Sequence, residues 1–207
     1  AAAAAERRHG RPAAALEILL PQVEAHLRDP DFWIAVGRAA LDLGSLPQAG
    51  TAFERVVALR PDDRDGLIGA GQVLQARGLC ADACNVWEHG AAAHPADPVL
   101  PSLLGVDLLR RGQWEAAERW LREALRRQPG HADALAGLGS ICERTGRSAE
   151  GAALLDRWTA GPRPHGAVAA VHARCLLGDG QPESALALLD RALAAGPDRG
   201  RSVQLHH

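Results

Sequence analysis

The 207-residue sequence contains no methionine, no tyrosine and no lysine, and aromatic residues make up only 3% of it. Aromatic and β-branched residues are the ones that strands favour, so their scarcity argues against a β-rich fold. Alanine, leucine and arginine are abundant instead, and all three are good helix formers. The composition therefore predicts an all-α protein.

Charge and hydropathy exclude further classes. The formal net charge is −2, mildly acidic before residue 98 and mildly basic after it, and this is not the clustered basic face that nucleic-acid binding needs. No apolar run approaches the roughly 20 residues that span a bilayer. Residues 1–10 lack the leucine-rich core of a secretion signal. We expect a cytoplasmic protein, or a periplasmic one if a signal has been removed.

The two ends of the sequence carry no functional signal. The chain has no methionine to start from, as expected for an internal or processed fragment. We expect residues 1–9 to be a partly ordered helix or placeholder residues. Residues 200–207 are expected to be a tail with the remnant of a tag at its end, Leu205, His206 and His207.

Glycines and prolines recur at a fixed interval of 34 residues. The glycines are Gly10, Gly44, Gly78, Gly112, Gly146 and Gly180. The prolines are Pro61, Pro95, Pro129 and Pro197, with Arg163 in the missing place between Pro162 and Pro164. This period indicates an array of structural repeats over residues 10–197. We predict a half-repeat over 10–29, then repeats 30–63, 64–97, 98–131, 132–165 and 166–199.

Each repeat predicts two helices, one before the glycine at position 15 and one between it and the proline at position 32. Position 8 is small: Gly37, Gly71, Gly105, Gly139 and Ala173. Position 20 is also small: Ala15, Ala49, Ala83, Ala117, Gly151 and Ala185. Position 24 is large: Leu19, Phe53, Trp87, Leu121, Leu155 and Leu189. We expect small residues to let paired helices approach and the large residue to fill the space between neighbouring pairs.

Together with Trp33 at position 4 and Leu104 and Leu138 at position 7, this pattern resembles the tetratricopeptide repeat family. The resemblance implies a right-handed superhelical solenoid of antiparallel helix pairs whose first helices line a concave groove. It also implies a non-catalytic protein–protein interaction scaffold that holds a peptide or protein segment there. The alternatives are a structural, self-assembling repeat module and an accessory domain of a larger protein whose catalytic or export domain lies outside this chain.

The family lines its groove with positions 2, 5, 6, 9, 12 and 13 of each repeat. The resemblance therefore implies a binding site formed by Arg38, Asp65, Gln72, Val99, Leu103, Val106, Arg110, Ser140, Arg144 and Arg174. The middle repeat is unusually apolar for a solvent-facing surface. An apolar strip rimmed by charge is typical of a binding surface; the alternative is that a neighbouring segment covers it. The clamp with which chaperone-binding members hold a terminal carboxylate is absent from the matching positions.

Two motifs imitate other chemistry. Four residues have the spacing of a zinc finger, but all lie on or beside one predicted helix, too spread out to bind one ion: Cys80, Cys84, His89 and His94. The stretch GLIGAGQ (66–72) resembles a phosphate loop but follows no strand. We therefore expect no metal, no cofactor and no catalytic residue. Gly69 in this stretch either weakens the helix or opens a shallow pocket.

Four residues lie at positions that the family buries. Asp107 and His172 replace apolar residues there, which predicts either a structural partner or a ligand for each. Cys142 and Cys175 are predicted to be buried thiols.

The last helix pair has few residues after it to cover its outer face. We therefore expect a homo-oligomer to form weakly through the C-terminal pair, around Ala185, Leu188, Leu189 and Leu193.

Overall fold

The computed structural model describes residues 2–196, whose regular structure is entirely helical. Contacts divide the chain into one compact unit up to Pro95 and a second from Ala96 onward. The first unit contains α1 (Ala2–Arg8), α2 (Pro12–Leu19), the 3₁₀ helix η1 (Leu20–His26), α3 (Pro30–Asp42), α4 (Leu46–Leu59), α5 (Arg64–Ala76) and α6 (Cys80–Ala93). The second contains α7 (Val99–Arg110), α8 (Trp114–Arg127), α9 (Ala132–Arg144), α10 (Ser148–Thr159), α11 (Gly166–Gly178) and α12 (Pro182–Ala194). The prediction of an all-α fold is confirmed. The predictions made for Pro197 and for residues 200–207 concern residues outside the described part of the chain.

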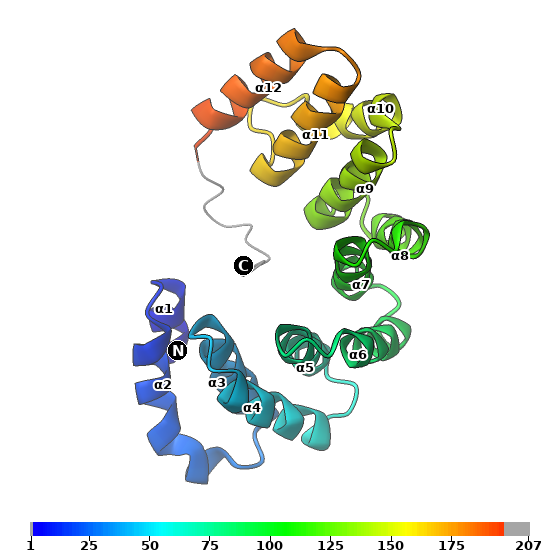
Figure 1. Ribbon diagram of the computed structural model, residues 1–207. Coiled ribbons are helices and arrows are strands. Elements are labelled where there is room, and N and C mark those ends of the chain that lie inside the picture. Colours follow the sequence, from blue (N-terminus) through cyan, green and yellow to red (C-terminus); the bar gives the residue numbers. More distant parts are fainter. Residues whose placement is uncertain (1, 197–207) are drawn as a thin grey trace. The chain divides into compact units, whose positions relative to one another are not determined.

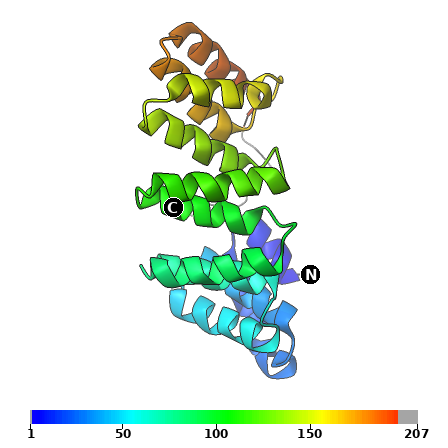
Figure 2. The ribbon, with the colours of Figure 1, turned by 90° about the vertical axis from the view of Figure 1, so that its right-hand side faces the viewer.

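Within each unit the helices pack in consecutive pairs (Figures 1 and 2). In the first unit α1 packs on α2, α3 on α4 and α5 on α6, while the second unit pairs α7 with α8, α9 with α10 and α11 with α12. The second helix of a pair also packs on the first helix of the next, as α4 does on α5 and α10 on α11. First helices touch one another as well, which places their side chains on a shared surface within each unit.

The glycine at position 15 ends the first helix of every pair. All six of these glycines have φ between 72° and 79°, the left-handed region that side chains with a Cβ avoid. The residue after each glycine donates a backbone hydrogen bond back to the helix, as Ser45 N does to Ala40 O at 2.8 Å. This is the Schellman arrangement, and it satisfies carbonyls that the helix end would otherwise leave without partners.

Aspartate side chains cap the N-termini of three of the first helices. Asp29, Asp63 and Asp97 lie one repeat apart, and each accepts hydrogen bonds from backbone N–H groups of the following turn. The corresponding residues before α9 and α11 are His131 and His165, whose side chains make no such cap. The first three boundaries are therefore fixed by the usual side-chain cap, and the last two are not.

The large residue at position 24 fits against the glycine at position 8 of its own pair. A Cβ added at Gly37 would lie 2.7 Å from the Phe53 ring, and one at Gly105 would lie 2.5 Å from Leu121. Phe53 and Leu121 are almost completely buried. The predicted close approach of paired helices is confirmed, because a side chain at either glycine would overlap this packing.

The interpretation of Gly69 as a residue that opens a shallow pocket is wrong. A Cβ at Gly69 would overlap the Phe53 ring from the preceding pair, so the glycine makes room for that ring. It opens no pocket. Gly137, two repeats further on and in the second unit, has the same role, since a Cβ added there would lie 2.8 Å from Leu121. Phe53 and Leu121 are thus each held between the glycines of two successive first helices.

The second helix of the first pair is shorter than predicted. It ends at Leu19 and continues as the 3₁₀ helix η1, which has Pro21 in its first turn. Proline cannot donate a backbone hydrogen bond, and its ring clashes with the carbonyl four residues earlier. The α-helical ladder therefore cannot pass through residue 21.

Asp107 and His172 both have structural partners. The carboxylate of buried Asp107 lies 3.1 Å from Arg111 Nε. Buried His172 places Nδ1 2.6 Å from Thr159 Oγ1. Burial lowers the pKa of His172; Asp156 opposes this effect and Arg191 adds to it. His172 is therefore held in its neutral form, and the predicted structural pairing is confirmed for both residues.

This burial predicts a loss of stability at acidic pH. The pKa of His172 is lower in the folded state than its usual value of about 6.5, so the unfolded chain binds a proton first. The contribution of neutral, buried His172 to the free energy of unfolding is fully present above that value and is lost as the pH falls below it. We expect the urea midpoint of His172→Gln to depend less on pH between about 7 and 5 than that of the wild type. A slope identical to the wild type's would contradict this account, and His9→Gln, at an exposed histidine, is the control.

Candidate ligand-binding surface

All ten residues of the predicted binding site lie on first helices. Arg38 lies on α3, and Asp65 and Gln72 lie on α5, all in the first unit. The other seven lie on α7, α9 and α11 of the second unit. The four arginines are exposed and the remaining six residues are half-buried, so none belongs to a fully buried core. The three apolar members, Val99, Leu103 and Val106, are half-buried on α7.

Ion pairs join successive first helices in both units. Arg38 Nη2 on α3 lies 2.7 Å from Asp65 Oδ2 on α5. In the second unit, Arg174 Nε on α11 lies 2.8 Å from Glu143 Oε2 on α9. These pairs are partly exposed and contribute at most about 1 kcal/mol each to stability, so a ligand can replace them at little cost.

The three arginines of the predicted site that lie in the second unit, Arg110, Arg144 and Arg174, differ in their surroundings. Arg174 has Glu143 as its partner, and the guanidinium of Arg144 lies 5.7 Å from the centre of the Trp114 ring. Arg110 makes no ion pair with any residue from 2 to 196. Neither Glu143 nor Trp114 was distinguished by the sequence as a partner, because both contacts depend on the conformations of long side chains.

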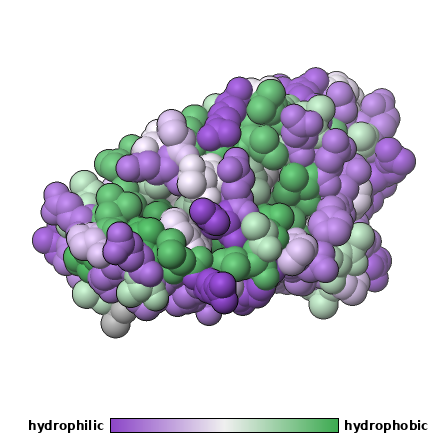
Figure 3. Space-filling model, turned by 90° about the horizontal axis from the view of Figure 1, so that it is seen from below, coloured by the Kyte–Doolittle hydropathy of each residue, from purple (hydrophilic) through white to green (hydrophobic). Residues whose placement is uncertain are grey.

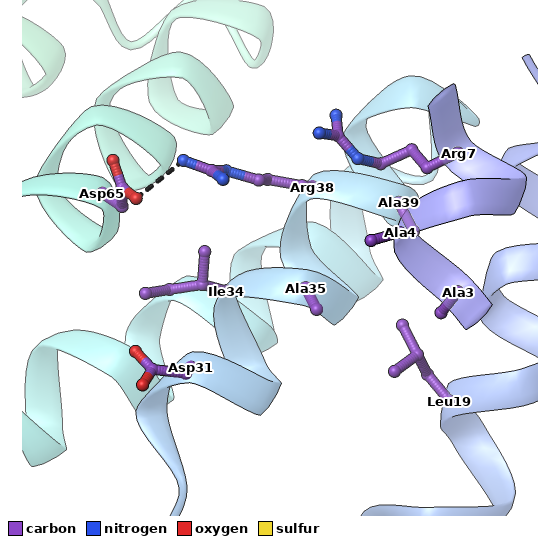
Figure 4. A pocket seen from close by; sticks show the side chains of 10 residues that line it. All are labelled: Ala3, Ala4, Arg7, Leu19, Asp31, Ile34, Ala35, Arg38, Ala39 and Asp65. Carbon is purple, nitrogen blue, oxygen red and sulfur yellow. Dashed lines mark ion pairs between the residues drawn. The ribbon is translucent and has the colours of Figure 1, made fainter. Parts of the chain in front are cut away.

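A cleft of about 280 Å³ opens among the first helices of the first unit (Figure 4). Its apolar floor consists of Ala3, Leu19, Ile34, Ala35 and Ala39, from α1, α2 and α3. Charged side chains surround it, namely Arg7, Asp31, Arg38 and Asp65. The predicted site residues Arg38 and Asp65 are thus brought together at its edge, where Figure 4 shows their ion pair.

The wall that α1 contributes to this cleft is missing from the sequence prediction. Ala3 lies 34 residues before Gly37, so it occupies the small position 8 of an earlier first helix, and it is 8% exposed. Arg7 Nη1 pairs with Asp42 Oδ2 at 3.0 Å, which fixes α1 against α3. Extending the 34-residue period back from Gly37 would have revealed this helix, but the alanine run has no other distinguishing signal.

The zinc-finger-like residues have other partners. His89 Nε2 lies 2.8 Å from Asp62 Oδ1, and His94 Nε2 lies 2.7 Å from the Asp62 carbonyl oxygen. No group of three potential ligands suited to a metal ion occurs among residues 2–196.

The predicted buried thiols are confirmed. Cys142 and Cys175 are buried, and burial raises the pKa of both, that of Cys175 to about 11. At neutral pH such thiols are protonated and poorly reactive.

The face shown in Figure 3 is mixed in character. On this face, hydrophobic residues lie among hydrophilic ones. None of the described helices combines the length and the apolar character needed to cross a bilayer.

Three comparisons relate the chain to known proteins. It is 31% identical over 149 residues to cellulose synthase operon protein C of Xanthomonas axonopodis pv. citri (strain 306), covering 68% of this chain and 10% of that protein. The crystal structure of PilW, a type IV pilus biogenesis factor, has a TM-score of 0.77 with 15% identity over 93% of this chain and 89% of PilW. YrrB, described as a TPR protein with an unusual peptide-binding site, has a TM-score of 0.59 with 19% identity over 89% of this chain and 95% of YrrB.

The extent of these matches sets what they show. This chain spans about a tenth of the length of the curated relatives it matches. The likeness to the two crystal structures concerns the fold, because their identity to this chain is low. The model of the family described as tetratricopeptide repeat matches residues 1–64 and 102–166, more than half of the chain. The chain belongs to the tetratricopeptide repeat family.

Proposed function

We propose that this chain is a non-catalytic scaffold that holds a peptide or protein segment of a partner against its first helices. Membership of a family whose domains typically mediate protein–protein interaction supports this proposal. The observation that carries it is the exposure of the first-helix surface. The ten side chains of the predicted site are exposed or half-buried, whereas the residues at position 8, and at position 24 up to Leu155, are buried in the interior.

The chemistry of this surface suits a protein ligand. In the second unit it combines half-buried Val99, Leu103 and Val106 with exposed arginines. A few side chains packed at the centre supply most of the binding energy at such interfaces, and charges at the rim mainly increase the association rate and the specificity. We therefore expect a ligand with apolar anchors and acidic residues for the second unit.

Site-specific photocrosslinking tests which surface the partner occupies. A benzophenone amino acid replaces Ser140 on first helix α9 or, as the matched control, exposed Ala149 on second helix α10. After irradiation in native cell extract, we expect one defined partner to crosslink at position 140 at a yield several-fold above that at position 149. Mass spectrometry identifies the partner. Leu103→Ala should weaken its binding by about 1–3 kcal/mol, because central apolar anchors dominate interfaces.

Equal crosslinking from both positions, or crosslinking from position 149 alone, would place the partner elsewhere and contradict the proposal. Circular dichroism of each variant serves as the folding control.

We propose homo-oligomerisation through α12 as a second candidate function, with a corrected set of contact residues. Ala185 and Leu188 of the predicted set are each 2% exposed and belong to the core of the second unit. Leu186 and Leu193, seven residues apart on the same side of α12, are 63% and 78% exposed. Exposed leucines at this spacing form an apolar stripe that favours association.

Sedimentation velocity tests this second candidate. We expect the wild type to associate weakly with rising protein concentration and Leu186→Glu/Leu193→Glu to stay monomeric, because charges replace the apolar stripe. Ala187→Glu, at an exposed neighbouring residue, is the control for an added negative charge on α12 and should associate like the wild type. A wild-type protein that remains monomeric up to about millimolar concentration, where contacts worth only about 4 kcal/mol are populated, would rule this interface out.

A further inference from the structure

We propose that the cleft of the first unit binds a partner segment in which one aliphatic side chain lies between a basic and an acidic residue. This inference rests on the proposed scaffold function and names the class of ligand for one part of its surface. It follows from the order of side chains on α3, from the pairing of the surrounding charges and from the size of the cleft.

The order of side chains on α3 defines the ligand's order. Asp31, Ile34 and Arg38 lie at helical spacings of three and four residues, so they share one face. The seven-residue step from Asp31 to Arg38 corresponds to about 10.5 Å along the helix axis. Figure 4 shows Ile34 between the two charged side chains. The cleft therefore presents an acid, an apolar surface and a base in sequence, and a complementary ligand carries a base, an apolar residue and an acid.

Arg38 and Asp31 can each form an ion pair with a ligand without leaving their present partners unpaired. Asp65 forms two ion pairs. Its Oδ2 lies 2.7 Å from Arg38 Nη2, and its Oδ1 lies 2.8 Å from Arg64 Nη1. If a ligand carboxylate binds Arg38, Asp65 keeps Arg64.

The acidic end behaves in the same way. Arg60 contacts Asp31 at 2.7 Å and Asp63 at 3.2 Å, and the Asp31 side chain is 79% exposed. A basic group of the ligand can therefore bind Asp31 while Arg60 keeps Asp63. These ion pairs are partly exposed and each displaced residue keeps a second partner, so both exchanges cost little free energy.

The size and lining of the cleft specify the central group. Its volume of about 280 Å³ lies at or below the lower limit for pockets that bind drug-sized molecules, and it suits one or two aliphatic side chains. Ala3 of α1 and Ile34 of α3 are each 8% exposed, and Ala35 of α3 is half-buried. These groups offer only apolar contact, so the central side chain gains affinity by leaving water.

The arrangement does not favour a nucleic acid. The arginines at the cleft, Arg7 and Arg38, are both paired with carboxylates, Asp42 and Asp65. Binding of a phosphate backbone depends on an excess of basic groups, which is lacking here.

A phage-displayed library of random 12-residue peptides, selected on the full chain, tests the proposal. We expect enrichment of sequences with leucine, isoleucine or valine, a basic residue within about three positions on one side and an acidic residue within about three on the other, since an extended chain advances about 3.3 Å per residue. One enriched peptide is then synthesised, and its affinity is measured by isothermal titration calorimetry.

Variants of the chain localise the bound peptide. Ala35→Phe places a ring in the cleft and should weaken binding at least about tenfold, as loss of a central anchor does. Arg38→Gln should weaken it less, and the remaining affinity should depend less on salt. Ala58→Phe, at an exposed residue of α4 outside the cleft, is the size-matched control and should bind like the wild type. Circular dichroism confirms that each variant is folded.

The outcomes separate this inference from the proposed function. Peptides whose binding is unchanged by Ala35→Phe and weakened by Leu103→Ala would overturn the cleft assignment and leave the scaffold function standing. Enrichment of purely basic or purely acidic peptides without an aliphatic residue would also overturn it. No enrichment above an uncoated surface would contradict both the scaffold function and the cleft.

Discussion

The packing of a large position-24 side chain against the position-8 glycine of its own pair, joined at Phe53 and Leu121 by a glycine of the next pair, is the constraint on which the rest of this structure depends. Phe53 lies against Gly37 of its own pair and Gly69 of the next, and Leu121 lies in the same way against Gly105 and Gly137. A helical glycine costs about 1 kcal/mol relative to alanine. The buried ring or leucine offsets this cost through apolar burial and close contact, and it sets how closely neighbouring pairs approach.

This packing leaves the outer face of the first helices free for other interactions. The interior is built from positions 8, 20 and 24, so the side chains at positions 2, 9 and 12 are not needed for it. They form exchangeable ion pairs instead, Arg38 with Asp65 in the first unit and Arg174 with Glu143 across α9 and α11 in the second. Binding chemistry can therefore differ between repeats of one fold, and the apolar residues of α7 and the charged cleft beside α3 illustrate the difference.

The parts of the structure that depend on backbone geometry were predictable from the sequence. Left-handed turns at Gly44 and its equivalents follow directly from the glycine period. The role of Gly69 was not predictable in this way, because it depends on a ring that arrives from the preceding pair. The cleft was missed because its wall, α1, is an alanine run whose only signal is that Ala3 falls on the repeat. Ion pairs of long arginines depend on side-chain conformation, which a repeat pattern does not determine.

A double-mutant cycle between Phe53 and Gly69 tests the central claim most directly. The free energy of unfolding is measured by urea denaturation for the wild type, Gly69→Ala, Phe53→Leu and the double variant. Gly69→Ala should destabilise the wild type by about 1–3 kcal/mol through overpacking, despite the better helix propensity of alanine. In the Phe53→Leu background, which lacks the nearest ring atoms, the same change should cost at least about 0.5 kcal/mol less. A Gly69→Ala variant that is more stable than the wild type, with additive effects in the double variant, would contradict this account.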